Sequence, residues 1–523
     1  MSREKDIDLC LKYANLWFQN VDATFKTIDE FIEKHSALFI FNDKDKKMVR
    51  NKIYDSHSVH MLDELSVLED SGDHEKWINT AQRQGLKRNI DWHFWDHYKQ
   101  YITSKGYSKD IIENLDSVTT RILASLEDPS RTGNWDRRGL VMGSVQSGKT
   151  ANYTGLIAKA IDSGYKMIVV LTGVHNSLRS QTQQRINEEL LGYDPQKAIR
   201  MEDISYQKFG VGKYPTHRDK GFIQSLTTSS EKGDFSKQSA AQTGLYDESR
   251  PYILIIKKHV SILKNLKEWL AFTAGEEDEK GRIRVNNVPL LVIDDECDQA
   301  SVNTKKTITD PDTGFVNPEC DPTTTNRRIR ELLTIFDKSA YIGYTATPYA
   351  NIFIHHENKH PEYGEDLFPK NFIFNLPIPD NYCGASKIFG IKDEDKGPLS
   401  IVGRIEDSEE IFPPKHKKDL EVTELPESMI RSIKCFLLSS AARRLRKTKN
   451  THNSMLIHVT RFTNVQNKIH SLVSNEIRIL RGRIGAKGPL EDLKKIWEED
   501  FTQISKEMEH EGGVVHLWKE IHS

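Results

Sequence analysis

The segment GSVQSGKT at residues 143–150 has the spacing of a loop that binds nucleotide phosphates, GxxxxGK[ST]. It follows an apolar run, GLVM, and precedes a stretch with helical periodicity, as such a loop requires. Its glycines let backbone N–H groups face phosphate oxygens, and a helix amino terminus favours anions. We expect Lys149 to reach the β- and γ-phosphates of ATP and Thr150 to ligate Mg²⁺. The residues expected to bind ATP are Gly143, Gln146, Ser147, Gly148, Lys149 and Thr150.

A second group of reactive side chains, DDECD at residues 294–298, follows an apolar strand predicted for residues 289–293. A carboxylate at the end of a buried strand beside a phosphate loop is a suitable ligand for Mg²⁺. In one register Asp295 ligates the metal, Glu296 orients or deprotonates the attacking water, and Asp298 contacts neighbouring motifs. In a register shifted by one residue, Asp294 ligates the metal and Asp295 polarises the water. The prediction uses the first register, with Lys149, Asp295 and Glu296 as catalytic residues, and the second stays open.

The strand predicted in YIGYTATP ends in Thr345, Ala346 and Thr347, some 50 residues after the acidic run. This ending resembles the Ser/Thr-Ala-Thr motif of superfamily II helicases. There, hydroxyl groups couple the nucleotide site to the domain that binds nucleic acid. The resemblance implies the same coupling role for these three residues and for Asp298.

Several polar side chains follow the other predicted strands and suit contacts to a nucleic-acid backbone. They are Arg179, Gln181, Thr182, Lys257 and Lys258, together with Arg461 near the end of the chain. Capped helix starts and solvated lysines explain the same residues equally well. Residues 431–490 hold thirteen Lys or Arg and one acid, Glu476, in a chain of net charge −2. This concentration favours nucleic-acid contact with strong salt dependence, and a plain basic helix surface is the alternative.

The elements that would position these residues begin near residue 138, where short apolar runs alternate with amphipathic segments. Such alternation predicts an α/β fold, a parallel sheet with helices on both faces. We expect a helical accessory domain at 1–125 and an ATPase lobe at 126–354 with a polar insertion near 200–250. A linker or insertion at 355–430 would then precede a second α/β unit at 431–523, which includes a strand at 454–460.

Bulk properties exclude some classes of protein. Five cysteines lie far apart and form no CxxC pair, so a zinc site or a disulfide framework is not expected and a reducing cytosol fits. No leader-like segment and no apolar run of about 20 residues occurs, so we expect a cytoplasmic protein without a membrane span. Pro379-Asp380 and Glu394-Asp395-Lys396 formally fit the PD…ExK spacing of metal-dependent nucleases. Because no apolar strand presents Glu394 and Lys396, we do not expect them to form a cutting centre.

The motifs together resemble the Z-one domain family, whose members are labelled endonucleases and occur in bacterial restriction or anti-phage loci. The resemblance rests on the phosphate loop, LLVIDDECDQAS, YIGYTATPYANIF and SMLIHVTRFTNVQNKI, and it extends from about residue 90. It implies a superfamily II helicase-like ATPase with RecA-like lobes that acts on DNA rather than RNA, beside a methyltransferase or nuclease.

The sequence departs from the family pattern in its second RecA-like lobe, which is expected to be incomplete. The family's Gly-Asn…Leu-Ser-Arg-Gly and Gly-Arg-Trp-Phe-Gly-Tyr segments are not found here. We expect either a truncated or split gene product, or a missing part, with the arginine that reaches the γ-phosphate, that is supplied in trans. Such arginines are worth about 10³–10⁵ in rate, so the chain alone would hydrolyse ATP poorly. A nucleotide-gated switch and a true endonuclease are the alternative functions.

Overall fold

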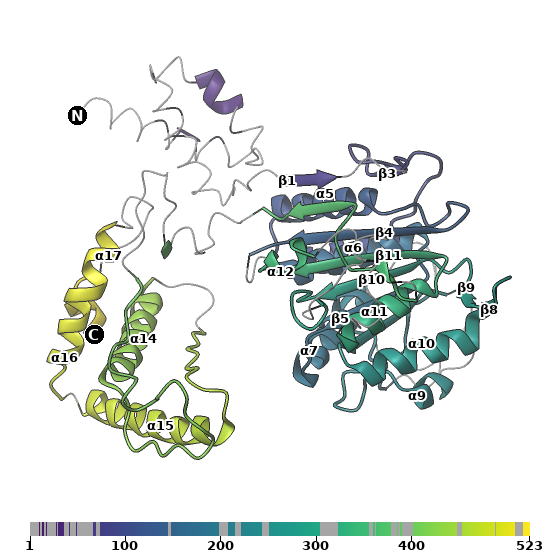
Figure 1. The fold of residues 1–523 in the computed structure, drawn as a ribbon. Coiled ribbons are helices and arrows are strands. Elements are labelled where there is room, and N and C mark those ends of the chain that lie inside the picture. Colours follow the sequence, from purple (N-terminus) through teal and green to yellow (C-terminus); the bar gives the residue numbers. More distant parts are fainter. Residues whose placement is uncertain are drawn as a thin grey trace. The chain divides into compact units, whose positions relative to one another are not determined.

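The structure is a computed structural model that describes most of the chain from residue 74 onward. The described ranges are 66–69, 74–144, 148–197, 208–214, 221–242, 250–303, 323–354, 359–360, 362–377, 401–446, 452–486, 488–507 and 516–522, with single positions in 10–49 and 384–389. The chain forms two compact units, Met1–Tyr382 and Cys383–Ser523 (Figure 1).

The first unit is built on one eight-stranded sheet with helices on both faces, visible in Figure 1. All neighbouring strands pair in parallel except β1, which runs antiparallel to β14. The strands, in sheet order, are β1 (Ser66–Glu69), β14 (Phe372–Asn375), β4 (Trp135–Met142), β11 (Lys338–Thr345), β10 (Leu290–Asp295), β5 (Met167–Thr172), β7 (Tyr252–Lys257) and β6 (Gln224–Ser225). The α/β class with a mostly parallel sheet, predicted from the alternation of runs, is therefore confirmed.

Alternate residues of the central strands enter two separate cores, one on each face of the sheet. On β10, Leu291 and Ile293 pack with helix α6 (Lys149–Ser163), whereas Leu290 and Val292 pack with α10 (Val260–Ala274). Side chains of a strand point to opposite faces in turn, so strands buried on both faces must be apolar throughout. The remaining helices of this unit are α4 (His93–Ser104), α5 (Lys109–Ser125), α7 (Asn176–Ile186), α9 (Lys237–Gln242), α11 (Thr324–Thr334), α12 (Tyr349–Ile352), η1 (Asn187–Leu191) and η2 (Gly210–Lys213).

The expected boundary at residue 125 is wrong, because α4 and α5 belong to the same core as the sheet. Trp95 and Tyr98 of α4 are buried in that core with residues of α6. The Lys159 ammonium of α6 is buried and bonds Asp116 of α5, at 2.5 Å from its carboxylate, and lies 4.2 Å from the Trp95 ring centre. The described aromatic residues of α4 therefore help to cover one face of the sheet.

The expected linker at 355–430 and the expected insertion near 200–250 also contribute strands to the main sheet. Strand β14, placed by the sequence in a linker at 355–430, pairs with β4 inside the main sheet. The polar insertion near 200–250 contributes β6 to the other edge. Three short hairpins decorate the unit: β2 (Ile78–Asn79) with β3 (Gln84–Gly85), β8 (Gly275–Glu277) with β9 (Ile283–Val285), and β12 (Lys359–His360) with β13 (Gly364–Glu365).

The second unit is helical in its described residues and contains no strand there, contrary to the expected second α/β unit. Residues 454–460, predicted as a strand, have no strand partner among the described residues, and Leu456 is 87% exposed. A strand exists only by pairing with a neighbour, so an apolar run alone does not produce one. The helices are α14 (Glu427–Leu445), α15 (Thr463–Gly485), α16 (Glu491–Ile496), η3 (Trp497–Phe501), α17 (Thr502–Glu507) and α18 (Trp518–His522). Among all described helices of the chain, none has the length and apolarity to cross a membrane.

Candidate active site

The residues predicted to do chemistry gather at the carboxyl edge of the parallel sheet. Thr345 at the end of β11 lies level with Met142, after which the phosphate loop begins. Asp295 at the end of β10 pairs in register with Tyr344. Thr172 of β5 lies beside Lys257 of β7. The carboxyl ends of parallel strands are the usual ligand-binding edge of an open α/β sheet.

The segment predicted to be a phosphate loop, residues 143–150, leads into α6, and Lys149 is the first residue of that helix. Its Nζ donates to the carbonyl oxygens of Gly143, at 2.8 Å, and Ser144, at 3.0 Å. Burial lowers the pKa of this ammonium. The nearby Asp295 and Glu296 carboxylates act in the opposite direction but do not cancel the effect of burial. Gly148 precedes the helix with φ +86°, a left-handed conformation that favours glycine. Gln146 and Ser147 lie outside the described residues.

Asp295 is the acidic residue that faces this helix. Its Oδ2 lies 3.3 Å from the hydroxyl of Tyr153 on α6. Burial raises the pKa of Asp295, and the neighbouring Glu296 carboxylate raises it further. The hydroxyl of Tyr344 in turn donates to Asn152 on α6 at 2.9 Å. The helix that begins at Lys149 is thus tied to the ends of β10 and β11 by two tyrosines.

Asp294 points to the opposite face and is engaged in a buried cluster. Its Oδ1 lies 2.8 Å from Lys258 Nζ, and its Oδ2 accepts from the Tyr341 hydroxyl at 2.6 Å. Neither Asp294 nor the Lys258 side chain is exposed. The geometry therefore favours the first predicted register, with Asp295 near Lys149, over the one that assigned the metal to Asp294. The strand's twofold alternation contains this signal, since Asp295 shares its face with Leu291 and Ile293.

Glu296 begins the turn after β10 with φ +55°, a left-handed conformation unusual for glutamate. Lys258 Nζ donates to the Glu296 carbonyl at 2.6 Å and to the Gln299 carbonyl at 3.1 Å. These two hydrogen bonds stabilise the turn. A side chain at Gly173 would approach the Glu296 carboxylate, Oε2, to 3.2 Å. The Glu296 carboxylate thus lies against the end of β5.

Asp298 joins the acidic turn to the Thr-Ala-Thr segment. Its Oδ1 accepts from the Thr345 hydroxyl and its Oδ2 from the Thr347 hydroxyl, both at 2.7 Å. The Thr347 N–H also donates to Thr345 Oγ1 at 2.9 Å, so the segment is folded around one carboxylate. Ala346, between the two threonines, is half-buried and has no polar group to contribute.

Two residues predicted to contact nucleic acid are buried, and those predictions are wrong. Arg179 is fully buried and donates to the carbonyl oxygens of Thr228, at 2.7 Å, and Ser230, at 2.5 Å, so its guanidinium holds that loop. Lys258 is buried under the Glu296 turn. A cation without solvent access cannot reach a phosphate of another molecule.

The other residues predicted to contact nucleic acid remain accessible. Gln181 is exposed and Thr182 is half-buried, both on α7. Lys257 is half-buried and donates to Asn176 Oδ1 at 2.9 Å. Arg461 is exposed in the second unit, with its guanidinium 5.1 Å from the Phe462 ring centre.

The basic region at 431–490 is partly neutralised by acids that follow it in the chain. Lys434 and Arg483 both pair with Asp492, at 2.8 and 2.9 Å, and Arg431 pairs with Asp500 at 2.9 Å. A count that stops at residue 490 misses these partners. For these three residues, ion pairs within the second unit favour the alternative of a basic helix surface over nucleic-acid contact.

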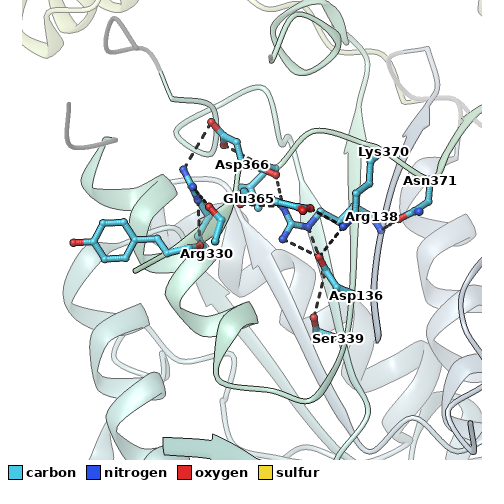
Figure 2. A network of polar contacts seen from close by, with 11 residues as sticks. Asp136, Arg138, Arg330, Ser339, Glu365, Asp366, Lys370 and Asn371 are labelled. Carbon is cyan, nitrogen blue, oxygen red and sulfur yellow. Dashed lines mark hydrogen bonds and ion pairs between the residues drawn. The ribbon is translucent and has the colours of Figure 1, made fainter. Parts of the chain in front are cut away.

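A second polar cluster lies at the amino ends of β4 and β11, shown in Figure 2. Asp136 Oδ2 lies 2.9 Å from Arg138 and 3.2 Å from Lys370, and Lys370 is 2.7 Å from Glu365. Burial raises the pKa of Asp136, but Arg138 and Lys370 outweigh it and hold this pKa below its usual value. The cluster borders a cavity of about 370 Å³. Its charges satisfy one another, so we assign it to holding residues 364–371 against the sheet.

The donor set at the carboxyl edge fits ATP and Mg²⁺. Gly148 and Lys149 lie at the start of α6, where backbone N–H groups favour an anion. Lys149 is the cation on the loop, and Asp295 and Thr150 offer the carboxylate and hydroxyl oxygens that Mg²⁺ prefers. The described residues contain no cluster of three His, Cys, Asp or Glu side chains that could hold a metal without phosphate oxygens. The two PD…ExK segments lie outside the described residues.

Comparison with known proteins gives one family. The Z1 domain matches residues 428–523, within the second unit. This match supports a relation to the Z1 family over that segment, which contains neither the phosphate loop nor the acidic turn. A search of curated proteins finds no match to the chain.

Proposed function

We propose that this protein is an ATP-hydrolysing, superfamily II helicase-like motor with a RecA-like first lobe that remodels or moves along DNA. The observation that carries the proposal is the pair of hydrogen bonds from Thr345 and Thr347 to Asp298, directly after Asp295 and Glu296. A P-loop alone would fit any nucleotide-binding protein. A motor must couple its nucleotide site to the segment that responds to nucleic acid. The Asp298 carboxylate, which joins the acidic turn to the Thr-Ala-Thr segment, could provide that coupling.

The proposed roles follow from position and chemistry. Lys149 would bind the β- and γ-phosphates, and Thr150 with Asp295 would orient the metal. Glu296, in its left-handed turn, would orient the attacking water and take up its proton. Mg²⁺·ATP would supply the scissile phosphate bond and a cation that offsets its charge. A change at the phosphates would reach Thr345 and Thr347 through Asp298.

The setting of this motor comes from the resemblance to the Z-one family. We propose that it acts in the cytoplasm on DNA, beside a methyltransferase or nuclease of a restriction or phage-defence system. An endonuclease activity of this chain would need residues around Glu394 and Lys396, which lie outside the described residues.

The test is Mg²⁺-dependent ATP hydrolysis by the full chain, with and without single- and double-stranded DNA. Lys149→Ala and Glu296→Gln should each lower turnover by about 10²-fold or more. Glu279→Gln, an exposed acid on the β8–β9 hairpin, is the matched control and should hydrolyse ATP normally. Tight ATP binding without turnover would favour the nucleotide-gated switch. Absence of ATP binding would refute the proposal.

A further inference from the structure

The second unit contains a cavity of about 690 Å³ that the proposed ATP site does not use. One wall is residues 414–417 and the other is residues 458–462. Its volume lies within the range of ligand pockets, roughly 300–1,000 Å³. The first wall comes from the run PPKHKK, which the sequence suggested to be a linker.

The charges that line this cavity have one sign. Lys415, Lys417 and Arg461 carry permanent positive charge, and His416 and His458 add two imidazoles. None of the described residues that line the cavity is acidic. Three cations held around one hollow without a carboxylate repel one another, and an anion in the hollow relieves that repulsion.

The two walls are fixed to each other by the His416 ring. Its Nδ1 lies 2.7 Å from the Pro413 carbonyl, which can only accept, so Nδ1 carries the proton. Its Nε2 lies 2.6 Å from the Thr460 hydroxyl, and Thr460 Oγ1 also accepts the Phe462 N–H at 3.2 Å. The segment that carries Lys415 and Lys417 is therefore held beside the segment that carries Arg461, and all three residues line the cavity.

Arg461 has the chemistry to select phosphate. Its guanidinium lies over the Phe462 ring, 5.1 Å from the ring centre, which restricts its orientation. A planar guanidinium donates two parallel hydrogen bonds to one phosphate, and two lysines provide further contacts to the same or the next phosphate. By contrast, Lys468 next to this region is paired with Glu421 at 2.8 Å.

We propose that this cavity binds consecutive phosphate groups of a nucleic-acid strand, through Lys415, Lys417 and Arg461. The inference rests on the proposed action on DNA and adds to it a defined contact site in the second unit, where the sequence suggested Arg461 and the basic region 431–490 but not Lys415 or Lys417. A strand bound there would be held by its backbone and without regard to base sequence.

The experiment uses the full chain without ATP and a fluorescently labelled single-stranded oligonucleotide, with affinity measured by anisotropy over a series of salt concentrations. The double variant Lys415→Gln/Arg461→Gln should bind at least about tenfold more weakly. The slope of log affinity against log salt should become shallower by about 1.4, since each of the two lost phosphate contacts on a single strand removes about 0.7. Lys415→Arg, which keeps the charge, should bind like the parent chain.

Lys418→Gln is the matched control, because Lys418 is exposed and adjacent but does not line the cavity. Wild-type oligonucleotide affinity in the double variant would overturn the proposal. An equal loss of affinity in Lys418→Gln would also overturn it, because it would show that the oligonucleotide is attracted by the general positive charge of this surface. Inorganic pyrophosphate is the other probe. Tight pyrophosphate binding that the double variant loses, with unchanged oligonucleotide affinity, would assign the cavity to free phosphates instead.

Failure of this site and failure of the proposed function are separable. Lys149→Ala should abolish ATP turnover and leave oligonucleotide binding unchanged, because Lys149 belongs to the first unit and the cavity belongs to the second. If the chain hydrolyses no ATP but the double variant still loses oligonucleotide affinity, the cavity assignment stands and the motor proposal falls.

Discussion

Lys258 and Asp294 form an ion pair with 2.8 Å between Nζ and Oδ1, and neither side chain is exposed. The same ammonium donates to the backbone carbonyls of Glu296 and Gln299. A single buried charge thus connects the end of β7 to the turn that carries the proposed catalytic glutamate. This arrangement explains how Glu296 keeps a left-handed backbone, at a cost of order 1–3 kcal/mol for such conformations.

Lys258→Met should destabilise the first unit strongly, because it leaves the Asp294 carboxylate buried without its cation. We expect a loss of about 3–5 kcal/mol in the free energy of unfolding, measured by urea titration. Lys258→Met/Asp294→Asn should lose less than the single variant, since no unpaired charge remains. Lys257→Met, one residue away and half-buried, is the control. A loss below about 1 kcal/mol for Lys258→Met would contradict this account.

Thr345→Val should disconnect ATP turnover from DNA. The variant removes the hydrogen bond to Asp298 Oδ1 but leaves Lys149, Asp295 and Glu296 in place. Turnover without DNA should change by less than about threefold, while stimulation by DNA should be lost. Thr345→Ser keeps the hydroxyl and should restore stimulation. If the valine variant is stimulated as well as the parent chain, Asp298 does not transmit the signal.

Arg179→Met should weaken folding rather than DNA binding. Its guanidinium satisfies backbone carbonyls of the loop at 228–233, so its loss leaves buried acceptors unpaired, at about 1–3 kcal/mol each. Gln181→Ala, two residues along α7 and exposed, should leave the unfolding free energy unchanged and lower DNA affinity. If Arg179→Met keeps its normal stability but binds DNA more weakly, the prediction from the sequence that Arg179 contacts nucleic acid is correct after all.

Acid should destabilise the first unit through His97. Burial, together with the nearby His93 and Lys208, lowers the pKa of this imidazole from 6.5 to about 4. The unfolded chain then takes up its proton first as pH falls, so the free energy of unfolding declines between about 6.5 and 4. The fall attributable to His97 should be about 1–3 kcal/mol.

Urea titrations at neutral pH and near pH 4 test this point. His97→Gln should remove that part of the acid sensitivity, whereas His259→Asn, an exposed histidine of the same unit, should retain it. Equal pH dependence in the parent chain and His97→Gln would show that His97 titrates alike in both states.

Local spacing was enough to single out the candidate phosphate loop, the acidic run and the Thr-Ala-Thr segment as segments that follow strands. Each is a short stretch after an apolar strand, and parallel strands bring their carboxyl ends to one edge whatever the order of strands. The alternation of apolar runs predicted the sheet and the helices on its faces. These features depend on neighbours along the chain, which is why the sequence contains them.

Long-range packing decided the rest. Whether Asp294 or Asp295 faces α6 depends on which face of β10 that helix covers, and Lys258 meets Asp294 only because β7, β5 and β10 are successive neighbours in the sheet. Arg179 resembles a phosphate ligand in the sequence, yet a loop some 50 residues later buries it. The run at 454–460 resembles a strand, but pairing requires a partner that the described residues do not supply. A cation's function depends on what surrounds it, and that is a property of the tertiary structure.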